Sequence, residues 1–292
     1  MSGEPRGTSR AGGTSRAGVA VGASATAGGK ARARKVPPTT VIDPGDGSLL
    51  RLLRTVGTLV GPDMPRQCLV GGLAVMARLA SAHRVTSDID SVSDLTDERS
   101  ALDLLVERGG TRRGASVEID GVVVDVIEIG EFTPADLPDD DENERLFVFA
   151  HSWALATAED VELWGANEAG RVVEKVTVPV AMPAALVAMK LVSIPNRMGH
   201  REAKRSSDCY DLYRLCLLDS ARTPIADALA SAPEELAVAC RARLQRYLLD
   251  DAERSAGWIR QGATFMATLT ADDLRAVGAP LIRRFDAAAR EA

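Results

Sequence analysis

The pattern of apolar and polar residues predicts strands mixed with helices up to about residue 180 and helices alone after it. In the first part, short apolar runs alternate with stretches of helical spacing, and glycine or proline residues separate them. The elements expected there are a helix from Ser48, as N-cap, to about residue 60, a strand ending at Leu69 and Val70, helices at 73–82 and 97–108, and a β-hairpin of 115–119 and 122–129 around Asp120-Gly121.

The remaining pattern predicts two more strands and then a helical region. Strands are expected at 146–150 and 172–180, with Trp153 and Trp164 packed between them, and the acidic run at 138–144 is expected to be a solvated loop without a role. Helices are expected at 183–194, 202–219, 233–250 and 272–289, the last one containing Gly278 and Pro280, which favour a break. The fold class is therefore α+β, with a mixed sheet, flanking helices and a C-terminal helical lobe.

Charge is distributed unevenly along the 292 residues. The net charge is −6, but residues 1–40 contain seven Lys or Arg and one Glu, so the rest of the chain carries −12. These first residues are rich in Gly, Ala, Ser and Thr and repeat GTSRAG, a composition that cannot bury enough apolar surface to fold. A disordered basic tail is expected at 1–45, or alternatively a basic arm for RNA phosphates, because the acidic body does not attract nucleic acid through its overall charge.

Cysteine usage and hydropathy favour a cytoplasmic protein without a membrane segment. The four cysteines, at 68, 209, 216 and 240, lack the paired spacing of zinc sites and are expected to be reduced core residues. The chain contains no run of 18 apolar residues, so a transmembrane helix is not expected.

The stretch from Leu69 to Asp90 combines a diglycine turn with two aspartates. Gly71-Gly72 precedes a predicted helix, whose N-terminal amide groups favour an anion such as phosphate. After the helix, Thr86 and Ser87 lead into Asp88-Ile89-Asp90, and strand alternation places both carboxylates on one face. Two adjacent carboxylates suit Mg²⁺, which is commonly held by one or two carboxylates and substrate phosphates. A glycine turn for phosphate opposite such a pair is the arrangement required for nucleotidyl transfer.

A third carboxylate, Asp125, interrupts the second strand of the predicted hairpin. Its side chain shares a face with Val123, Ile127 and Ile129, where a carboxylate needs a cation or a donor. The alternative is that the alternation is shifted by one residue, so that Asp125 lies at an edge or faces solvent.

Charged residues recur in the predicted helical region. Lys190 lies in an apolar helix, so that its ammonium group either extends to the surface or meets an anion such as a triphosphate. In the next helix Lys204, Asp208 and Asp211 form one stripe, which alternatively contains only an exposed ion pair of Lys204 with Asp208. The connection between the helices holds a basic cluster that is either a phosphate-binding or RNA-binding site or a flexible connector: Arg197, His200, Arg201, Lys204 and Arg205.

From about residue 46 to its end, the chain resembles the AbiEii/AbiGii toxin family, including the MenA-type toxins, in the DNA polymerase β-like nucleotidyltransferase superfamily. The resemblance rests on Gly71-Gly72, on Arg84-Val-Thr-Ser-Asp-Ile-Asp90, and on the later Lys190, Asp208 and Asp211. It implies a polymerase β-like nucleotidyltransferase domain at 46–180 and a helical domain at 181–292. It also implies that Asp125 is the third metal ligand, that Lys190 and Asp211 are functional, and that Asp208 is a neighbouring acid of the same motif.

The function implied by the resemblance is Mg²⁺-dependent transfer of a nucleoside monophosphate from an NTP, possibly CTP or UTP, to the 3′ end of a tRNA. The expected partners are the NTP, the tRNA and a cognate antitoxin. The expected catalytic residues are Asp88, Asp90, Lys190 and Asp211, the metal ligands are Asp88, Asp90 and Asp125, and the nucleotide-binding residues are Gly71, Gly72, Thr86, Ser87, Arg197, Lys204 and Asp208. Alternatives are transfer to a small molecule or a protein, and a nucleotide-binding module without activity.

Overall fold

The computed structural model describes residues 38–42, 46–80, 86–95, 100–132, 134–137, 141–196, 202–262 and 267–291. The predictions for residues 1–37 and for Arg84, Arg197, His200 and Arg201 lie outside these ranges. None of the described helices is both long and apolar enough to cross a membrane.

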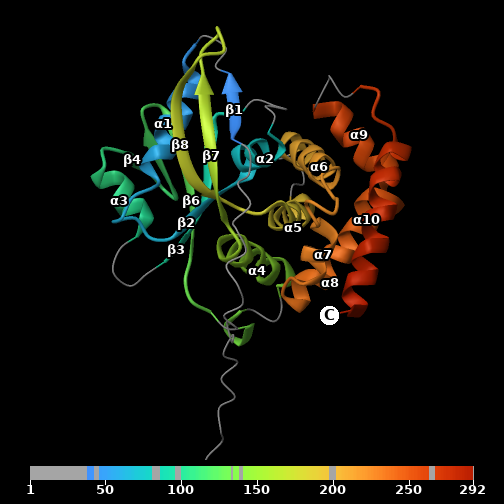
Figure 1. Ribbon diagram of the computed structural model, residues 1–292. Coiled ribbons are helices and arrows are strands. Elements are labelled where there is room, and N and C mark those ends of the chain that lie inside the picture. Colours follow the sequence, from blue (N-terminus) through green and yellow to red (C-terminus); the bar gives the residue numbers. More distant parts are fainter. Residues whose placement is uncertain are drawn as a thin grey trace, which may run out of the picture. The chain divides into compact units, whose positions relative to one another are not determined.

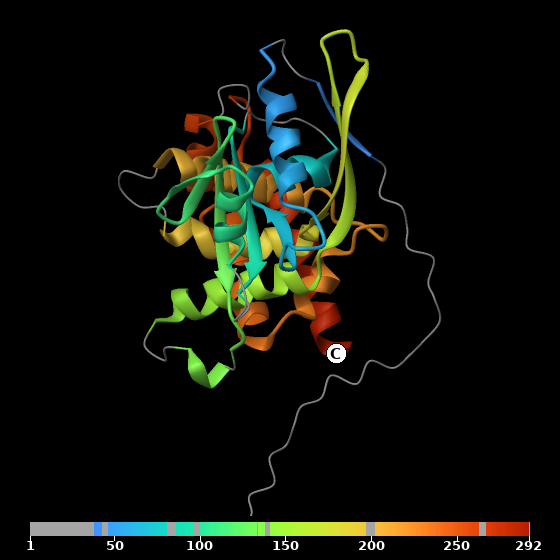
Figure 2. The ribbon, with the colours of Figure 1, turned by 90° about the vertical axis from the view of Figure 1, so that its left-hand side faces the viewer.

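Within the described residues, eight strands form one mixed sheet in the order β1-β7-β8-β2-β3-β6-β5-β4 (Figures 1 and 2). The pairs β1–β7, β2–β8 and β3–β6 are parallel, and the other neighbours are antiparallel. The strands are β1 (Thr39–Ile42), β2 (Gln67–Val70), β3 (Asp88–Asp94), β4 (Thr111–Arg113), β5 (Ser116–Ile119), β6 (Val122–Ile129), β7 (Glu159–Ala166) and β8 (Val172–Val180).

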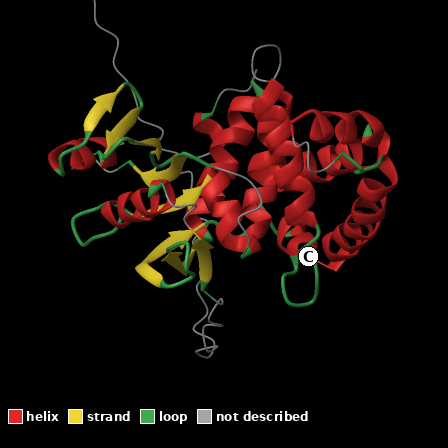
Figure 3. Cartoon of the chain, turned by 90° about the horizontal axis from the view of Figure 1, so that it is seen from above, coloured by secondary structure: helices red, strands yellow, loops and turns green. Residues whose placement is uncertain are grey.

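Most helices lie on one side of the strands, as the view from above shows (Figure 3). The helices are α1 (Ser48–Thr58), α2 (Gly71–Leu79), α3 (Ala101–Glu107), α4 (Glu142–Ala156), α5 (Pro183–Ser193), α6 (Glu202–Cys216), α7 (Ile225–Ala230), α8 (Glu234–Gln245), α9 (Ala252–Gly262) and α10 (Ala271–Glu291). The α+β class and the helical lobe are therefore confirmed, and the predicted boundary at 180/181 falls between β8 and α5.

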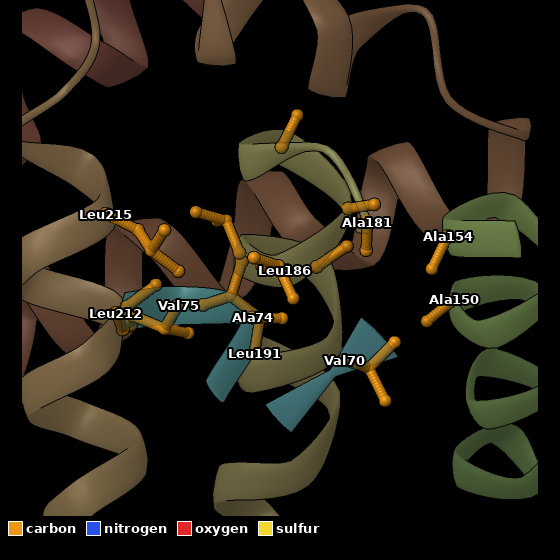
Figure 4. Packing of buried hydrophobic residues seen from close by; sticks show 14 of the residues in the cluster. Val70, Ala74, Val75, Ala150, Ala154, Ala181, Leu186, Leu191, Leu212 and Leu215 are labelled. Atoms are coloured by element: carbon orange, nitrogen blue, oxygen red, sulfur yellow. The ribbon is translucent and has the colours of Figure 1, made fainter. Parts of the chain in front are cut away.

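Helix α5 is central to the packing because nearly all of its side chains are apolar and buried. It contacts α2, α4, α6, α7 and α8, and in Figure 4 α4 and α6 lie on opposite sides of it. Leu186 and Leu191 of α5 are almost completely buried in this cluster. Burial of each such leucine stabilises the fold by about 1.5–3 kcal/mol, so the helix is held firmly beside the sheet.

Several predicted elements are confirmed. The helix at Ser48 is α1, although Gly47 rather than Ser48 is its N-cap residue. The Asp120-Gly121 hairpin is β5–β6, the strand at 172–180 is β8, and the first helix of the lobe is α5. The four cysteines are buried and free, and burial raises the pKa of their thiols, in agreement with the expected core residues.

The predicted strand at 146–150 is wrong, because these residues belong to α4. The Asp141 side chain caps this helix by accepting a hydrogen bond from the Glu144 amide, and Glu142 and Glu144 lie in the first turn. Acidic side chains are favourable at this end of a helix, so the acidic run, to which no role was assigned, contains a helix start.

Other differences concern elements that sequence alone did not indicate. Strand β1 lies inside the range expected to be a disordered tail and pairs with β7, a strand that was not predicted. Helices α7 and α9 were also not predicted, and the helix expected at 233–250 ends at Gln245 and continues as a π-helix. Helix α10 continues through Gly278 and Pro280. A side chain at Gly278 would collide with Leu248, so this glycine permits close packing and does not end the helix.

Candidate active site

Three carboxylates converge where β3 and β6 lie side by side. In this parallel pair, Asp90 is in register with Asp125, and Asp88 precedes Asp90 on the same face. One oxygen from each of Asp88, Asp90 and Asp125 lies within 4.8 Å of the other two. The alternation along β6 is as predicted, since Val122, Val124 and Val126 are buried while Asp125 is on the more open face. Strand β6 lies between β3 and β5, so the alternative that places Asp125 at an edge is wrong.

Hydroxyl groups hold two of these carboxylates in place. Ser116 lies opposite Asp125 in the antiparallel β5–β6 register, and its Oγ donates a hydrogen bond to Asp125 Oδ1. Thr86 Oγ1 donates to Asp88 Oδ1 at 3.1 Å. Each bond uses one acceptor site of a carboxylate and fixes its orientation, leaving the other oxygen for a cation. Sequence reasoning missed Ser116, although the register of a two-residue hairpin places it opposite Asp125.

The pKa of Asp90 reflects its burial and the negative charge of the carboxylates around it. Burial and the neighbouring charges of Asp88 and Asp125 together raise the pKa of Asp90 to about 6, against the lowering effect of Lys190 and Lys204. A carboxylate surrounded by other carboxylates ionises readily only when positive charge approaches it. The cluster is thus suited to a divalent cation bound through oxygen ligands.

The diglycine lies directly against Asp90. Gly71 is the first residue of α2 and has φ +64, a left-handed conformation that favours glycine. A Cβ at this position would overlap the Asp90 carboxylate, lying 2.5 Å from its Cγ and 2.8 Å from its Cβ. No described side chain caps the N-terminus of α2, which leaves amide groups of its first turn for an anion.

Lys190 lies inside the protein between two aspartates. Its Nζ is 2.6 Å from Asp208 Oδ1 and 2.8 Å from Asp211 Oδ2, and Ser193 Oγ donates to Asp208 Oδ2 at 3.0 Å. Burial lowers the pKa of Lys190, but the charges of Asp211 and Asp208 outweigh it and raise the pKa above its ordinary value. The lysine is therefore a permanent buried cation.

Two alternatives for this region are consequently wrong. Lys190 does not extend to the surface, because only 7% of the residue is exposed. Asp208 is not part of an ordinary exposed pair, since it is buried and bonds to Lys190, while Lys204 is exposed.

A cavity of about 360 Å³ connects these groups. Its lining includes Gly71 and Gly72 at α2, Asp88 and Asp90 on β3, and Lys190 and Asp208 between α5 and α6. Lys204 also lines it. Of the other candidates that the structure describes, Thr86, Ser87, Asp125 and Asp211 are not among the lining residues; Thr86 is buried beside Asp88, Ser87 is exposed, and Asp211 is completely buried beside Lys190.

Comparisons with known proteins identify the family of the chain. A sequence profile of the family described as "Nucleotidyl transferase AbiEii toxin, Type IV TA system" matches residues 59–291, most of the chain. Among solved structures, the chain is similar to an antigenic nucleotidyltransferase-like protein from Paracoccidioides brasiliensis, with 18% identity and a TM-score of 0.41 over 72% of this chain and 93% of that one. The curated protein sequences contain no significant match. The family assignment comes from the sequence profile and not from the remote structural likeness.

Proposed function

The chain belongs to the AbiEii nucleotidyltransferase toxins of type IV toxin–antitoxin systems, and on this premise we propose that it transfers a nucleoside monophosphate from an NTP to the 3′ end of a tRNA with the help of Mg²⁺. The observation that carries the proposal is one cavity that joins an acidic cluster, an uncapped helix N-terminus and a buried lysine. This combination offers a place for a metal ion, for phosphate oxygens and for the charge of the leaving group.

The acidic cluster fits Mg²⁺ by the chemistry of its donors. Asp88, Asp90 and Asp125 each provide a hard carboxylate oxygen, and the raised pKa of Asp90 indicates that added positive charge is favourable there. Bound to these residues, Mg²⁺ would supply positive charge for the attacking and leaving oxygens. Ser116 and Thr86 keep the carboxylates of Asp125 and Asp88 oriented. In the proposed reaction Asp125 completes the metal site and helps to remove the proton of the acceptor hydroxyl.

The phosphates are held by backbone amides and lysine. The amide groups at Gly71 and Gly72 face the cavity at the positive end of α2. An ammonium group has three donors, and two of those on Lys190 are directed to Asp208 and Asp211. The third donates to a phosphate oxygen, so that Lys190 stabilises charge on the departing pyrophosphate. Asp208 and Asp211 are then positioning residues, Lys204 and Arg197 assist phosphate binding, and Thr86 acts through Asp88.

The assignment of Asp88 is tested by Asp88→Ala with labelled NTPs and total tRNA. The variant should transfer no label and should keep nearly the melting temperature of the wild type, because Asp88 lies at the cavity and not in the apolar core. Asp160→Ala is a suitable control, since Asp160 is an exposed carboxylate on β7. Activity retained by Asp88→Ala would refute the assignment.

The acceptor and the antitoxin are tested separately. Each NTP is supplied with its α-phosphate labelled. Label should be transferred to intact tRNA but not to tRNA whose 3′ hydroxyl has been oxidised beforehand. Label found instead in protein or in a small molecule would refute the tRNA acceptor but not nucleotidyl transfer. Expression should arrest growth of the host, and both the antitoxin and Asp88→Ala should relieve the arrest.

A further inference from the structure

The cavity has a second wall without phosphate-binding chemistry. This wall comes from β6, α4 and α5 and consists of Ile127, Phe147, His151, Leu186, Met189 and Val192. Figure 4 shows α4 and α6 on opposite sides of α5, with Ala150 and Ala154 on one side and Leu212 and Leu215 on the other. The lining residues show that the cavity reaches from the charged side chains of α6 to an apolar wall at α4 and α5.

Two stacked aromatic rings stand on the α4 side. Phe147 and His151 are one helical turn apart, and their ring centroids are 3.9 Å from each other with the planes tilted by 36°. Phe147 is one of the exposed large apolar residues, with 38% of its surface accessible, whereas His151 is only 5% exposed. Phe147 thus lies toward the opening of the cavity and His151 deeper. A flat ring with polar groups at its edge matches such a wall better than a phosphate does.

The hydrogen bonding of His151 determines what its ring offers to the cavity. The Nδ1 atom lies 2.6 Å from the Phe147 carbonyl oxygen, which can only accept, so Nδ1 carries the proton. Burial lowers the pKa of His151 to about 4, which keeps the ring neutral at physiological pH. Within the described residues this is the only hydrogen bond of the ring. The second nitrogen, Nε2, is consequently an acceptor and not a donor.

We propose that this wall is the nucleobase subsite of the NTP, in which the base packs against the exposed edge of the Phe147 ring and His151 Nε2 accepts a hydrogen bond from the 4-amino group of cytosine or the 6-amino group of adenine. The inference rests on the proposed function, because it takes the charged side of the same cavity as the triphosphate site. Because His151 is the deeper ring, it meets the edge of the base farthest from the ribose. Cytosine (position 4) and adenine (position 6) carry an amino group at that edge, where uracil and guanine carry a carbonyl oxygen; the amino group of guanine is at position 2 and does not meet His151 in this orientation. The site therefore selects CTP over UTP and ATP over GTP.

The expected selectivity follows because His151 Nε2 can only accept a hydrogen bond. A carbonyl oxygen opposite Nε2 leaves two acceptors facing each other, while an amino group forms a hydrogen bond. The difference corresponds to roughly 10-fold in affinity. His151 is in this sense a specificity-determining residue for the donor nucleotide.

The first test uses the full-length wild-type protein with Mg²⁺ and measures the dissociation constants of CTP, UTP, ATP and GTP by titration calorimetry. CTP should bind about 10-fold more tightly than UTP, and ATP more tightly than GTP by a similar factor. Equal affinities within both pairs, or a preference for the keto bases, would overturn the proposal. This measurement requires no variant, so it stands even if a substitution prevents folding.

Two variants separate the roles of the rings. The amide of His151→Gln can present either an oxygen or an NH₂ group, so the CTP to UTP ratio should fall to about one while CTP still binds. Phe147→Leu removes the aromatic ring edge that the base contacts and should weaken binding of all four nucleotides by up to about 10-fold without changing the ratio. A ratio that survives in His151→Gln would contradict the assignment of the acceptor, and unchanged affinities in Phe147→Leu would contradict the contact with Phe147.

The outcomes distinguish this subsite from the proposed function. If CTP binds more tightly than UTP but no label is transferred, nucleotidyl transfer is refuted and the subsite is supported. If transfer occurs equally from all four nucleotides, the proposed function is supported and the subsite is refuted. If no nucleotide binds, both are refuted.

Discussion

Substitution of Gly71 by alanine tests how closely the diglycine and the acidic cluster depend on each other. At φ +64, an alanine costs about 1–2 kcal/mol because its Cβ crowds the backbone. Its Cβ would in addition lie 2.5 Å from Asp90 Cγ, so the carboxylate has to move by about 1 Å to restore ordinary contact at 3.4 Å. Displacement of a catalytic group by about 1 Å can cost on the order of 100-fold in rate. Gly71→Ala should therefore reduce kcat/KM for nucleotide transfer by at least about 100-fold.

Gly114→Ala provides a matched control. Gly114 has φ +65, and a Cβ there would meet nothing within 4 Å. Both variants should lose about 1–2 kcal/mol of unfolding free energy in urea, but only Gly71→Ala should lose transfer of labelled nucleotide to tRNA. Near wild-type transfer by Gly71→Ala, or an equal loss in Gly114→Ala, would refute the reasoning.

Three further predictions concern the charges and hydroxyls of the site. Lys190→Met removes the buried ammonium group that bridges Asp208 and Asp211 and should lower the unfolding free energy by about 3–5 kcal/mol, more than Asp208→Asn, which keeps the ion pair of Lys190 with Asp211; equal losses in urea unfolding would contradict this. In EDTA at pH 7.5, Asp90→Asn should stabilise the protein by about 2 kcal/mol, because a pKa of about 6 against 3.8 corresponds to about 3 kcal/mol before allowance for partial exposure. The folded state binds the proton of the Asp90 carboxyl group more tightly than the unfolded state does. The stability advantage of Asp90→Asn is therefore complete above pH 6 and should vanish below about pH 4, and denaturation curves at both pH values test this. Ser116→Ala should raise the Mg²⁺ concentration for half-maximal transfer by about 10–100-fold, whereas Ser116→Thr, which keeps the hydroxyl, should not; identical Mg²⁺ titrations would show that the hydroxyl has no role.

The local parts of the site could be predicted from sequence because short-range rules determine them. Gly71 and Asp90 belong to one strand–helix–strand unit, and strand alternation places Asp88 and Asp90 on the same face. Prediction of the Asp125 position required one more step, which was to decide which face of the second hairpin strand its side chain lies on. The register of the same hairpin would also have revealed Ser116, since a two-residue turn that pairs Ile119 with Val122 also pairs residue 116 with 125.

The parts that could not be predicted depend on tertiary packing. The 146–150 run is too short for periodicity to distinguish a buried helix from a strand, and the distinction lay in the capping group of Asp141 upstream. The pairing of Lys190 with two aspartates was also not evident, because it requires α5 and α6 to lie side by side. The place of His151 could not be predicted either, since a single histidine in a sequence gives no sign of the cavity that it lines.

The central position of α5 has a consequence for synthesis of the protein. A nascent chain that has left the ribosome only as far as β8 contains the acidic cluster and the diglycine but lacks α5 and α6, which carry Lys190 and its two partners. The cavity is complete only after residue 211 has emerged and the helices have packed against the sheet. An incomplete translation product therefore carries the three carboxylates but not the completed cavity, and under the proposed function it is inactive while it is still being synthesised.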